Sequence, residues 1–248
     1  MQDFFRRYNC KKESDSPFLH RRRALTMALI KVCGNRFALD AHMVAGFEPD
    51  YMGWIFVPAS PRCIPAVEAA RLIGQIRIQH PAIGHVGVMG GMGQDEIVRL
   101  IALLQSASPA DGFVLDALQL IGTSLHMEHT SQILRRKGLN TSLWPVLRVG
   151  EPVSDEDLIS LYHSDMYVLD RKVSHALGGT GRQIELPWIS RVTMPYLLAG
   201  GLNHENARER FEQTGARGVD ISSGLETGHP GRKDPAKLEK LFATFGRA

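Results

Sequence analysis

Eight short apolar runs recur along the chain, and each is followed by a segment long enough for one helix. Runs of this length, rich in Val, Ile and Leu, indicate β-strands. The predicted strands are Leu29–Cys33, Tyr51–Val57, His85–Met89, Ala117–Ile121, Pro145–Val149, Met166–Leu169, Tyr196–Ala199 and Gly218–Ser222. Eight βα units of this size fold either as a closed (β/α)8 barrel, the TIM barrel, or as a doubly wound sheet.

Apolar residues at helical spacing predict helices between these strands. They are a run opened by Pro65, Gln94–Gln105, Asp155–Tyr162, Asn203–Thr214 and Asp234–Phe245, with Asn203 and Asp234 as expected N-caps. The 248 residues come close to the roughly 250 typical of one barrel. No linker or change of composition interrupts the pattern, so we predict a single α/β barrel domain over residues 27–248.

Residues 1–26 differ from the rest in charge and pattern. They are polar and aperiodic and hold seven basic and three acidic side chains, whereas the other 222 residues hold 22 basic and 23 acidic ones. Such a segment cannot bury enough apolar surface to offset its ordering entropy, so we predict a disordered or loosely docked extension. The remaining chain has no excess of positive charge, and no nucleic-acid partner is expected.

A secretory signal is the alternative for this extension, because the apolar stretch Ala24–Ile30 follows three arginines. Lys31 ends that stretch at once and no small-residue cleavage site follows, which disfavours a signal peptide. Acidic residues dilute the basic character that a transit peptide needs. The extension is therefore expected to be dispensable or to reflect too early a start codon.

A chain beginning at Met27 should fold and keep its activity. Its melting temperature should stay within about 2 °C of the full-length value, because roughly 2–4 °C corresponds to 1 kcal/mol at this size. Thermal unfolding of the two forms tests this. Insoluble protein, or a melting point several degrees lower, would show that residues 1–26 pack on the barrel.

Compartment and cofactor expectations follow from composition. No run approaches 18 apolar residues, so no membrane partner is predicted. Three cysteines, Cys10, Cys33 and Cys63, cannot form a disulfide framework and indicate a reducing, cytoplasmic location. The ten histidines are scattered, and none pairs with Cys or a carboxylate at a metal-ligand spacing.

Glycine-rich turns follow the last two predicted strands, where a βα barrel carries its functional loops. Gly200 and Gly201 follow the seventh strand, and Ser223 and Gly224 follow the eighth. Such turns point backbone N–H groups at a phosphate, and a helix N-terminus behind them adds positive charge. Two such turns in adjacent units favour a phosphate site over simple tight turns.

Three reactive side chains follow other strands. Cys33 ends the first strand, Arg62 follows the second, and Asp170 follows the sixth. Taken alone, each has an ordinary interpretation: a small buried thiol, a surface charge and a structural cap. Alternatively, Asp170 is a catalyst at the end of an apolar strand, and Arg62 anchors an anionic group of a substrate.

In this order and context, these residues resemble the phosphoribosylanthranilate isomerase family of (β/α)8 barrels. The matching segments are Lys31-Val32-Cys33-Gly34, Gly53-Trp54-Ile55-Phe56, Ser60-Pro61-Arg62, Gln119-Leu120-Ile121-Gly122, Leu169-Asp170, Gly178-Gly179-Thr180-Gly181, Ala199-Gly200-Gly201-Leu202, Asn203-His204-Glu205-Asn206, Val219-Asp220-Ile221-Ser222-Ser223-Gly224-Leu225-Glu226 and Pro230-Gly231-Arg232-Lys233-Asp234. They keep the family's order and cover the chain from about residue 28 to its end.

The resemblance implies an Amadori rearrangement of a phosphoribosyl anthranilate, an aminoaldose, to the aminoketose of tryptophan biosynthesis, without cofactor or metal. It makes Asp170 the general acid that protonates the ring oxygen and Cys33 the general base that removes the C2′ proton. An acid that holds its proton near pH 7 needs a raised pKa, whereas a thiol base needs only a modestly lowered one.

The resemblance also assigns the binding residues. It makes Arg62 the partner of the anthranilate carboxylate. The phosphate site consists of Gly181, Gly200, Gly201, Ser223 and Gly224. Asp220 matches a position that lines the pocket, without an assigned role. The sequence leaves open whether the protein is a monomer or a homodimer.

Four departures from the family pattern stand out: Ile121 where His is expected, Thr123 where an acidic residue is expected, Gly90-Gly91-Met92-Gly93 where the third strand normally continues, and an extra residue at Gly228 or His229. None removes the expected acid, base or phosphate loops. They bear on affinity, rate and substrate identity.

Two other functions remain open. The sugar isomerase of histidine biosynthesis uses the same chemistry on a similar barrel, but its family has Asp where this chain has Cys33. A retired barrel that only binds a phosphosugar or an anthranilate-like ligand is the non-enzymatic alternative. Ile121 is the residue that favours it, whereas Cys33 and Asp170 argue against it.

Overall fold

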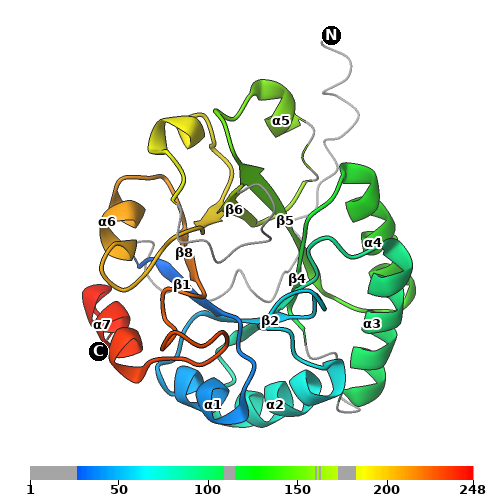
Figure 1. Cartoon of the computed structure of the whole chain (residues 1–248). Coiled ribbons are helices and arrows are strands. Elements are labelled where there is room, and N and C mark those ends of the chain that lie inside the picture. The colour runs from blue at the N-terminus through cyan, green and yellow to red at the C-terminus, as the bar shows by residue number, and fades with distance from the viewer. Residues whose placement is uncertain (1–26, 109–114, 160, 162, 173–182, 248) are drawn as a thin grey trace.

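The computed structural model describes residues 27–108, 115–159, 161, 163–172 and 183–247. Its eight strands pair in parallel and close in the order β1-β2-β3-β4-β5-β6-β7-β8 (Figure 1). The strands are β1 (Leu29–Cys33), β2 (Tyr51–Ile55), β3 (Gly84–Val88), β4 (Ala117–Leu120), β5 (Ser142–Val149), β6 (Tyr167–Arg171), β7 (Tyr196–Leu198) and β8 (Gly218–Ile221). The predicted TIM barrel is confirmed, and the doubly wound alternative is wrong.

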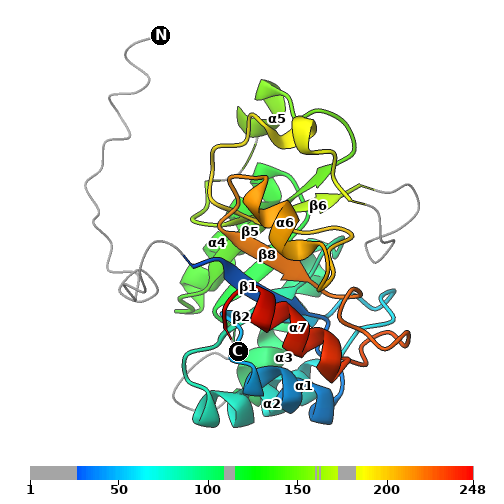
Figure 2. The same ribbon diagram turned by 90° about the vertical axis from the view of Figure 1, so that its left-hand side faces the viewer.

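Helices surround the barrel, as the side view also shows (Figure 2). They are α1 (Ala38–Gly46), α2 (Ala66–Gln79), α3 (Gln94–Ala107), α4 (Ser124–Arg136), α5 (Asp155–Ile159), a 3₁₀ helix (Leu186–Ile189), α6 (Ala207–Glu212) and α7 (Pro235–Thr244). Within the described ranges, none of these helices is long and apolar enough to cross a membrane. The predictions for residues 1–26 and for Gly181 lie outside the described part of the chain.

The main differences from the predicted elements occur where polar residues enter them. Strand β6 runs on through Asp170 to Arg171, because its partner β5 continues the ladder with Arg148 opposite Asp170. Strand β5 already begins at Ser142, since that residue pairs with Ala117. A strand predicted from a run of apolar residues ends at such a polar position, although both strands remain hydrogen-bonded beyond it.

One of the two predicted N-caps is correct. Asp234 accepts hydrogen bonds from the backbone N–H groups of Ala236 and Lys237 at the start of α7. Asn203 does not cap α6, which begins only at Ala207. Its side chain instead accepts from the N–H groups of Glu205 and Asn206 in the preceding turn. The turn after β7 is therefore longer than predicted.

Side chains fill the barrel interior. Because side chains alternate along a strand, every second residue points inward. At the lower level these are apolar: Val86, Ala117, Trp144, Val168, Leu197 and Ala199 form one buried cluster. Towards the carboxyl ends, the inward residues become polar, with Lys31 of β1 opposite Asp220 of β8 in the register. The closed barrel thus places polar groups above a packed apolar floor.

Candidate active site

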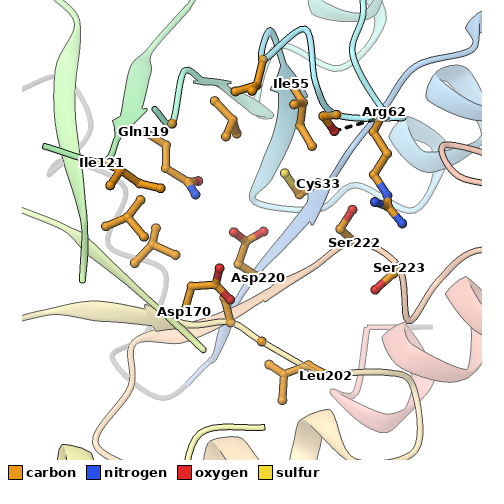
Figure 3. Close-up of a pocket in the computed structure, with 18 of the residues that line it drawn as sticks. Cys33, Ile55, Arg62, Gln119, Ile121, Asp170, Leu202, Asp220, Ser222 and Ser223 are labelled. Atoms are coloured by element: carbon orange, nitrogen blue, oxygen red, sulfur yellow. Dashed lines mark hydrogen bonds between the residues drawn. The ribbon is translucent and has the colours of Figure 1, made fainter. Parts of the chain in front are cut away.

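A cavity of about 230 Å³ lies at the carboxyl ends of the strands (Figure 3). Seven of the nine predicted catalytic and binding residues line it: Cys33, Arg62, Asp170, Gly200, Gly201, Asp220 and Ser223. Gly224 does not line it. The barrel therefore brings together residues that are up to 190 positions apart in the sequence, as the sequence analysis predicted.

Asp170 reaches the cavity from β6, close to the carboxyl group of Asp220 (Figure 3). Burial raises the pKa of Asp170 to about 6, and the charge of Asp220 adds to the shift. Arg148 and Lys31 oppose it. A carboxyl group with this pKa holds its proton far closer to neutral pH than an ordinary Asp, which is what a general acid requires.

Asp220 accepts a hydrogen bond from a buried lysine on the neighbouring strand. The Lys31 ammonium donates to Asp220 Oδ2 at 2.7 Å and to Gln119 Oε1 at 2.8 Å, and it is fully shielded from solvent. Burial lowers the pKa of Lys31, but Asp220 and Cys33 more than offset this effect and raise it above the ordinary value. A charged ammonium therefore acts electrostatically on both candidate catalytic groups, Cys33 and Asp170.

Cys33 ends β1 and is buried at the cavity wall. Burial raises the pKa of its thiol above the ordinary value, and Lys31 offsets this only in part. The protein's own groups thus hold the pKa of Cys33 in the opposite direction from the modest lowering that a thiol base needs. The neighbouring strand leaves space for the thiol, because a Cβ at Gly53 would lie 2.6 Å from Cys33 Sγ.

The two glycine-rich turns contribute in different ways. Gly200 has a φ of +87°, and a Cβ there would lie 2.8 Å from the backbone nitrogen of Arg171, so only glycine fits. Gly224 allows the two turns to touch, since a Cβ added at this position would lie 2.0 Å from the carbonyl oxygen of Leu202. Gly224 therefore lets the turn after β7 lie directly against the turn after β8, and both turns line the cavity through Leu202 and Ser223.

Arg62 lines the cavity on the side of Ser222 and Ser223 (Figure 3). Its guanidinium donates from Nε and Nη2 to the two carboxylate oxygens of Glu226, both at 2.7 Å. The sequence indicates Arg62 as a binding residue but gives no role to its partner Glu226. Burial alone would raise the pKa of Glu226, but the hydrogen bond from Arg62 and the charge of Lys233 hold it below its ordinary value.

Apolar side chains form the opposite part of the cavity. Ile121 lies away from Arg62 in the cavity (Figure 3), and Val88, Val146 and Val168 also line it. A Cβ at Gly90 would lie 3.0 Å from Ile121 Cδ1, so the third and fourth βα loops pack closely. This wall suits an aromatic or other apolar part of a ligand, whereas the side of Arg62 suits an anion.

Three polar residues of the site received no role from the sequence: Lys31, Gln119 and Ser222. Each lies within or directly after a predicted strand. A lysine inside the apolar run Leu29–Cys33 is costly to bury unless paired, and that cost was the available signal for Lys31. Ser222 Oγ is buried in the cavity wall without a protein partner in the described part of the chain.

The barrel has a cavity that holds a carboxyl group of raised pKa and a thiol beside two glycine-rich turns. These features define the class of (β/α)8 enzymes that move protons on small anionic substrates. Comparison with known proteins narrows this class. Residues 30–244 match the family described as N-(5'phosphoribosyl)anthranilate (PRA) isomerase. The chain therefore belongs to the phosphoribosylanthranilate isomerase family.

Individual relatives agree with this assignment. The N-(5'-phosphoribosyl)anthranilate isomerase of Geotalea uraniireducens is 33% identical over 220 residues, which cover 87% of this chain and 97% of that protein. The crystal structure of the Thermus thermophilus enzyme superposes with a TM-score of 0.70 at 25% identity, covering 88% of this chain and 98% of that one. The sugar isomerase of histidine biosynthesis is thus not the family of this chain.

Two further solved structures share the fold at 23% identity. One is a phosphoribosyl anthranilate isomerase in complex with reduced 1-(o-carboxyphenylamino)-1-deoxyribulose 5-phosphate, with a TM-score of 0.65 and coverage of 90% of this chain and 100% of that one. The other comes from a Thermotoga maritima enzyme described as dimeric, with a TM-score of 0.64 and the same coverage.

Proposed function

We propose that the chain isomerises N-(5'-phosphoribosyl)anthranilate to its 1-deoxyribulose 5-phosphate aminoketose in tryptophan biosynthesis. The observation that carries this proposal is the placement of Asp170, with a pKa of about 6, in one cavity with Cys33. An Amadori rearrangement needs a proton delivered to one atom and another removed from a neighbouring atom. The family to which the chain belongs supports the substrate.

The first step is ring opening. Asp170 donates its proton to the furanose ring oxygen while the bond between that oxygen and C1′ breaks. The lone pair of the anthranilate nitrogen forms the new C=N bond, which gives a protonated Schiff base. Asp170 is left as a carboxylate, and its raised pKa makes proton delivery near neutral pH favourable.

The second step is proton removal from C2′. The Cys33 thiolate takes this proton, and the electron pair forms a C1′–C2′ double bond that neutralises the Schiff base. The resulting enolamine gains a proton at C1′ and loses one from the C2′ hydroxyl, which leaves the ketone. A positive charge beside Cys33 favours the thiolate, so the Schiff base acts on the thiol in the same direction as Lys31.

The two anionic groups of the substrate fit the polar side of the cavity. Gly200, Gly201 and Ser223 provide the candidate phosphate site. The hydroxyl of Ser222, which has no hydrogen-bond partner among the described residues, extends it. Glu226 uses two of the five N–H donors of Arg62, so the others are available to the anthranilate carboxylate. Gly181 would complete the phosphate site by resemblance alone.

Restoring the family's histidine at position 121 tests the main departure of this site. Ile121→His should leave the fold intact and change kcat and KM by less than about 100-fold, because one added hydrogen-bonding contact contributes at most about 3 kcal/mol. Steady-state kinetics of both forms check this. A gain from no activity to full activity would instead identify the natural chain as a retired enzyme.

We infer a monomer or a homodimer, and a cytoplasmic enzyme, since the substrate is an intermediate of amino-acid biosynthesis. Among the described residues, no group of three or more His, Cys, Asp or Glu side chains is arranged to hold a metal ion.

Growth of a tryptophan auxotroph that lacks this isomerase tests the proposed function. The gene should restore growth without tryptophan, and the Cys33→Ser or Asp170→Asn form should not. Absence of growth with soluble, expressed protein would favour the retired barrel that only binds such a ligand.

A further inference from the structure

Glu226 lies between two buried or half-buried cations. Besides its two hydrogen bonds with Arg62, its carboxylate accepts a hydrogen bond from the backbone N–H of Gly231 at 2.9 Å. It also lies 3.5 Å from Lys233 Nζ. Its side chain is 5% exposed, that of Arg62 13% and that of Lys233 0%. A buried carboxylate with this many donors is held in one position.

Lys233 joins this group to the two ends of the catalytic strands. Its ammonium donates to the carbonyl oxygen of Cys33 at 2.7 Å and to that of Ser222 at 3.2 Å. Burial lowers the pKa of Lys233, and Glu226 opposes this shift. The segment after β8 therefore connects the ends of β1 and β8 to the guanidinium of Arg62.

Arg62 lies in the loop between β2 and α2, and its long side chain has many rotamers. A partner is therefore needed to hold its guanidinium in one position. The bidentate contact fixes the Nε and Nη2 edge of the guanidinium on Glu226. The remaining edge then has a defined direction at the cavity wall, which Arg62 lines. A guanidinium held in this way loses less entropy when it binds a second carboxylate.

We propose that Glu226 is a positioning residue that orients Arg62 for the substrate carboxylate. Glu226 contacts no reacting atom, and its effect passes through the guanidinium. The inference rests on the proposed function, because it specifies how that site distinguishes a carboxylated aromatic amine from one without the carboxylate.

Two ligands separate this role from a structural one. The first is reduced 1-(o-carboxyphenylamino)-1-deoxyribulose 5-phosphate, and the second is its phenylamino counterpart, which lacks only the carboxylate. Glu226→Asp keeps the negative charge beside Lys233 but withdraws it from Arg62. We expect its affinity for the carboxylated ligand, measured by titration calorimetry, to fall roughly 10- to 100-fold, the range of a charge-assisted hydrogen bond. Affinity for the counterpart should change less than about 3-fold.

The steady-state constants should divide in the same way. KM for N-(5'-phosphoribosyl)anthranilate should rise in Glu226→Asp, whereas kcat should change little, since the acid and the base remain in place. Glu226→Gln, which keeps the side-chain length and the bond from Gly231, is the second variant should Glu226→Asp not fold. Its expected effect on the two ligands is the same.

The chain offers a matched control. Glu68 and Arg71 form a bidentate pair of the same kind on the exposed surface of α2. Glu68→Asp should leave both affinities and both kinetic constants unchanged.

An equal loss of affinity for both ligands in the Glu226 variants, or no loss for either, would overturn the inference. So would failure of the unsubstituted protein to bind the carboxylated ligand. If that protein binds the ligand but does not isomerise the substrate, the proposed function fails, while the ligand comparison still decides the role of Glu226.

Discussion

Replacing Cys33 by serine is expected to lower kcat by at least roughly 10²- to 10⁴-fold, the contribution of a general base. A hydroxyl ionises far less readily than a thiol, so the variant lacks a base for the C2′ proton even though its side chain still fits beside Gly53. Affinity for reduced 1-(o-carboxyphenylamino)-1-deoxyribulose 5-phosphate should stay nearly the same. Steady-state kinetics and calorimetry on the purified variant measure the two effects.

Cys63 provides the control for this experiment. It is the other thiol in the described part of the chain, it is half-buried in the loop after β2, and it does not line the cavity. Cys63→Ser should keep kcat. Near-normal turnover of Cys33→Ser would remove Cys33 from the mechanism.

Replacing Asp170 by asparagine is expected to lower kcat by a similar factor, because an amide cannot deliver a proton to the ring oxygen.

The pH dependence of kcat/KM identifies the lost group. In the unsubstituted protein, kcat/KM should rise about tenfold per pH unit up to about pH 6, the pKa of Asp170, and then level off. Below pH 6 the acid is protonated and only the thiolate fraction grows. Above pH 6, loss of the Asp170 proton offsets that growth.

The plateau should end only at the pKa of Cys33, which burial holds above its ordinary value. In Asp170→Asn, the break near pH 6 should disappear. The residual kcat/KM should keep rising through pH 6 until the pH reaches the pKa of Cys33. If the break persists in Asp170→Asn, another residue supplies the acid.

The sequence predicts the barrel well, because eight apolar runs with intervening helices leave few other topologies. It predicts the location of Cys33, Arg62, Asp170 and Asp220 for the same reason: carboxyl ends of parallel strands meet at one end of a barrel. It fails where an element changes character at a polar residue. Strand β6 continues through Asp170, and Asn203 forms a turn of its own before α6.

The pKa of Cys33 could not be predicted from the residue types. Burial raises it, and the charge of Lys31 offsets this only in part. The partner of Arg62 lies 164 positions away in the sequence, so only the closed barrel shows that Glu226 already binds one edge of the guanidinium. Long-range pairs of this kind depend on side-chain geometry that a linear pattern does not contain.

We expect this cavity to perform an Amadori rearrangement with its own acid and base. Turnover of N-(5'-phosphoribosyl)anthranilate by the purified full-length protein tests it most directly, with the aminoketose product identified by mass and by its reduced derivative. We expect multiple turnovers at about 1 s⁻¹ or faster, as is usual for enzymes. Tight binding of the reduced product analogue without any conversion of the substrate would contradict it and identify a barrel that has kept the site but lost the reaction.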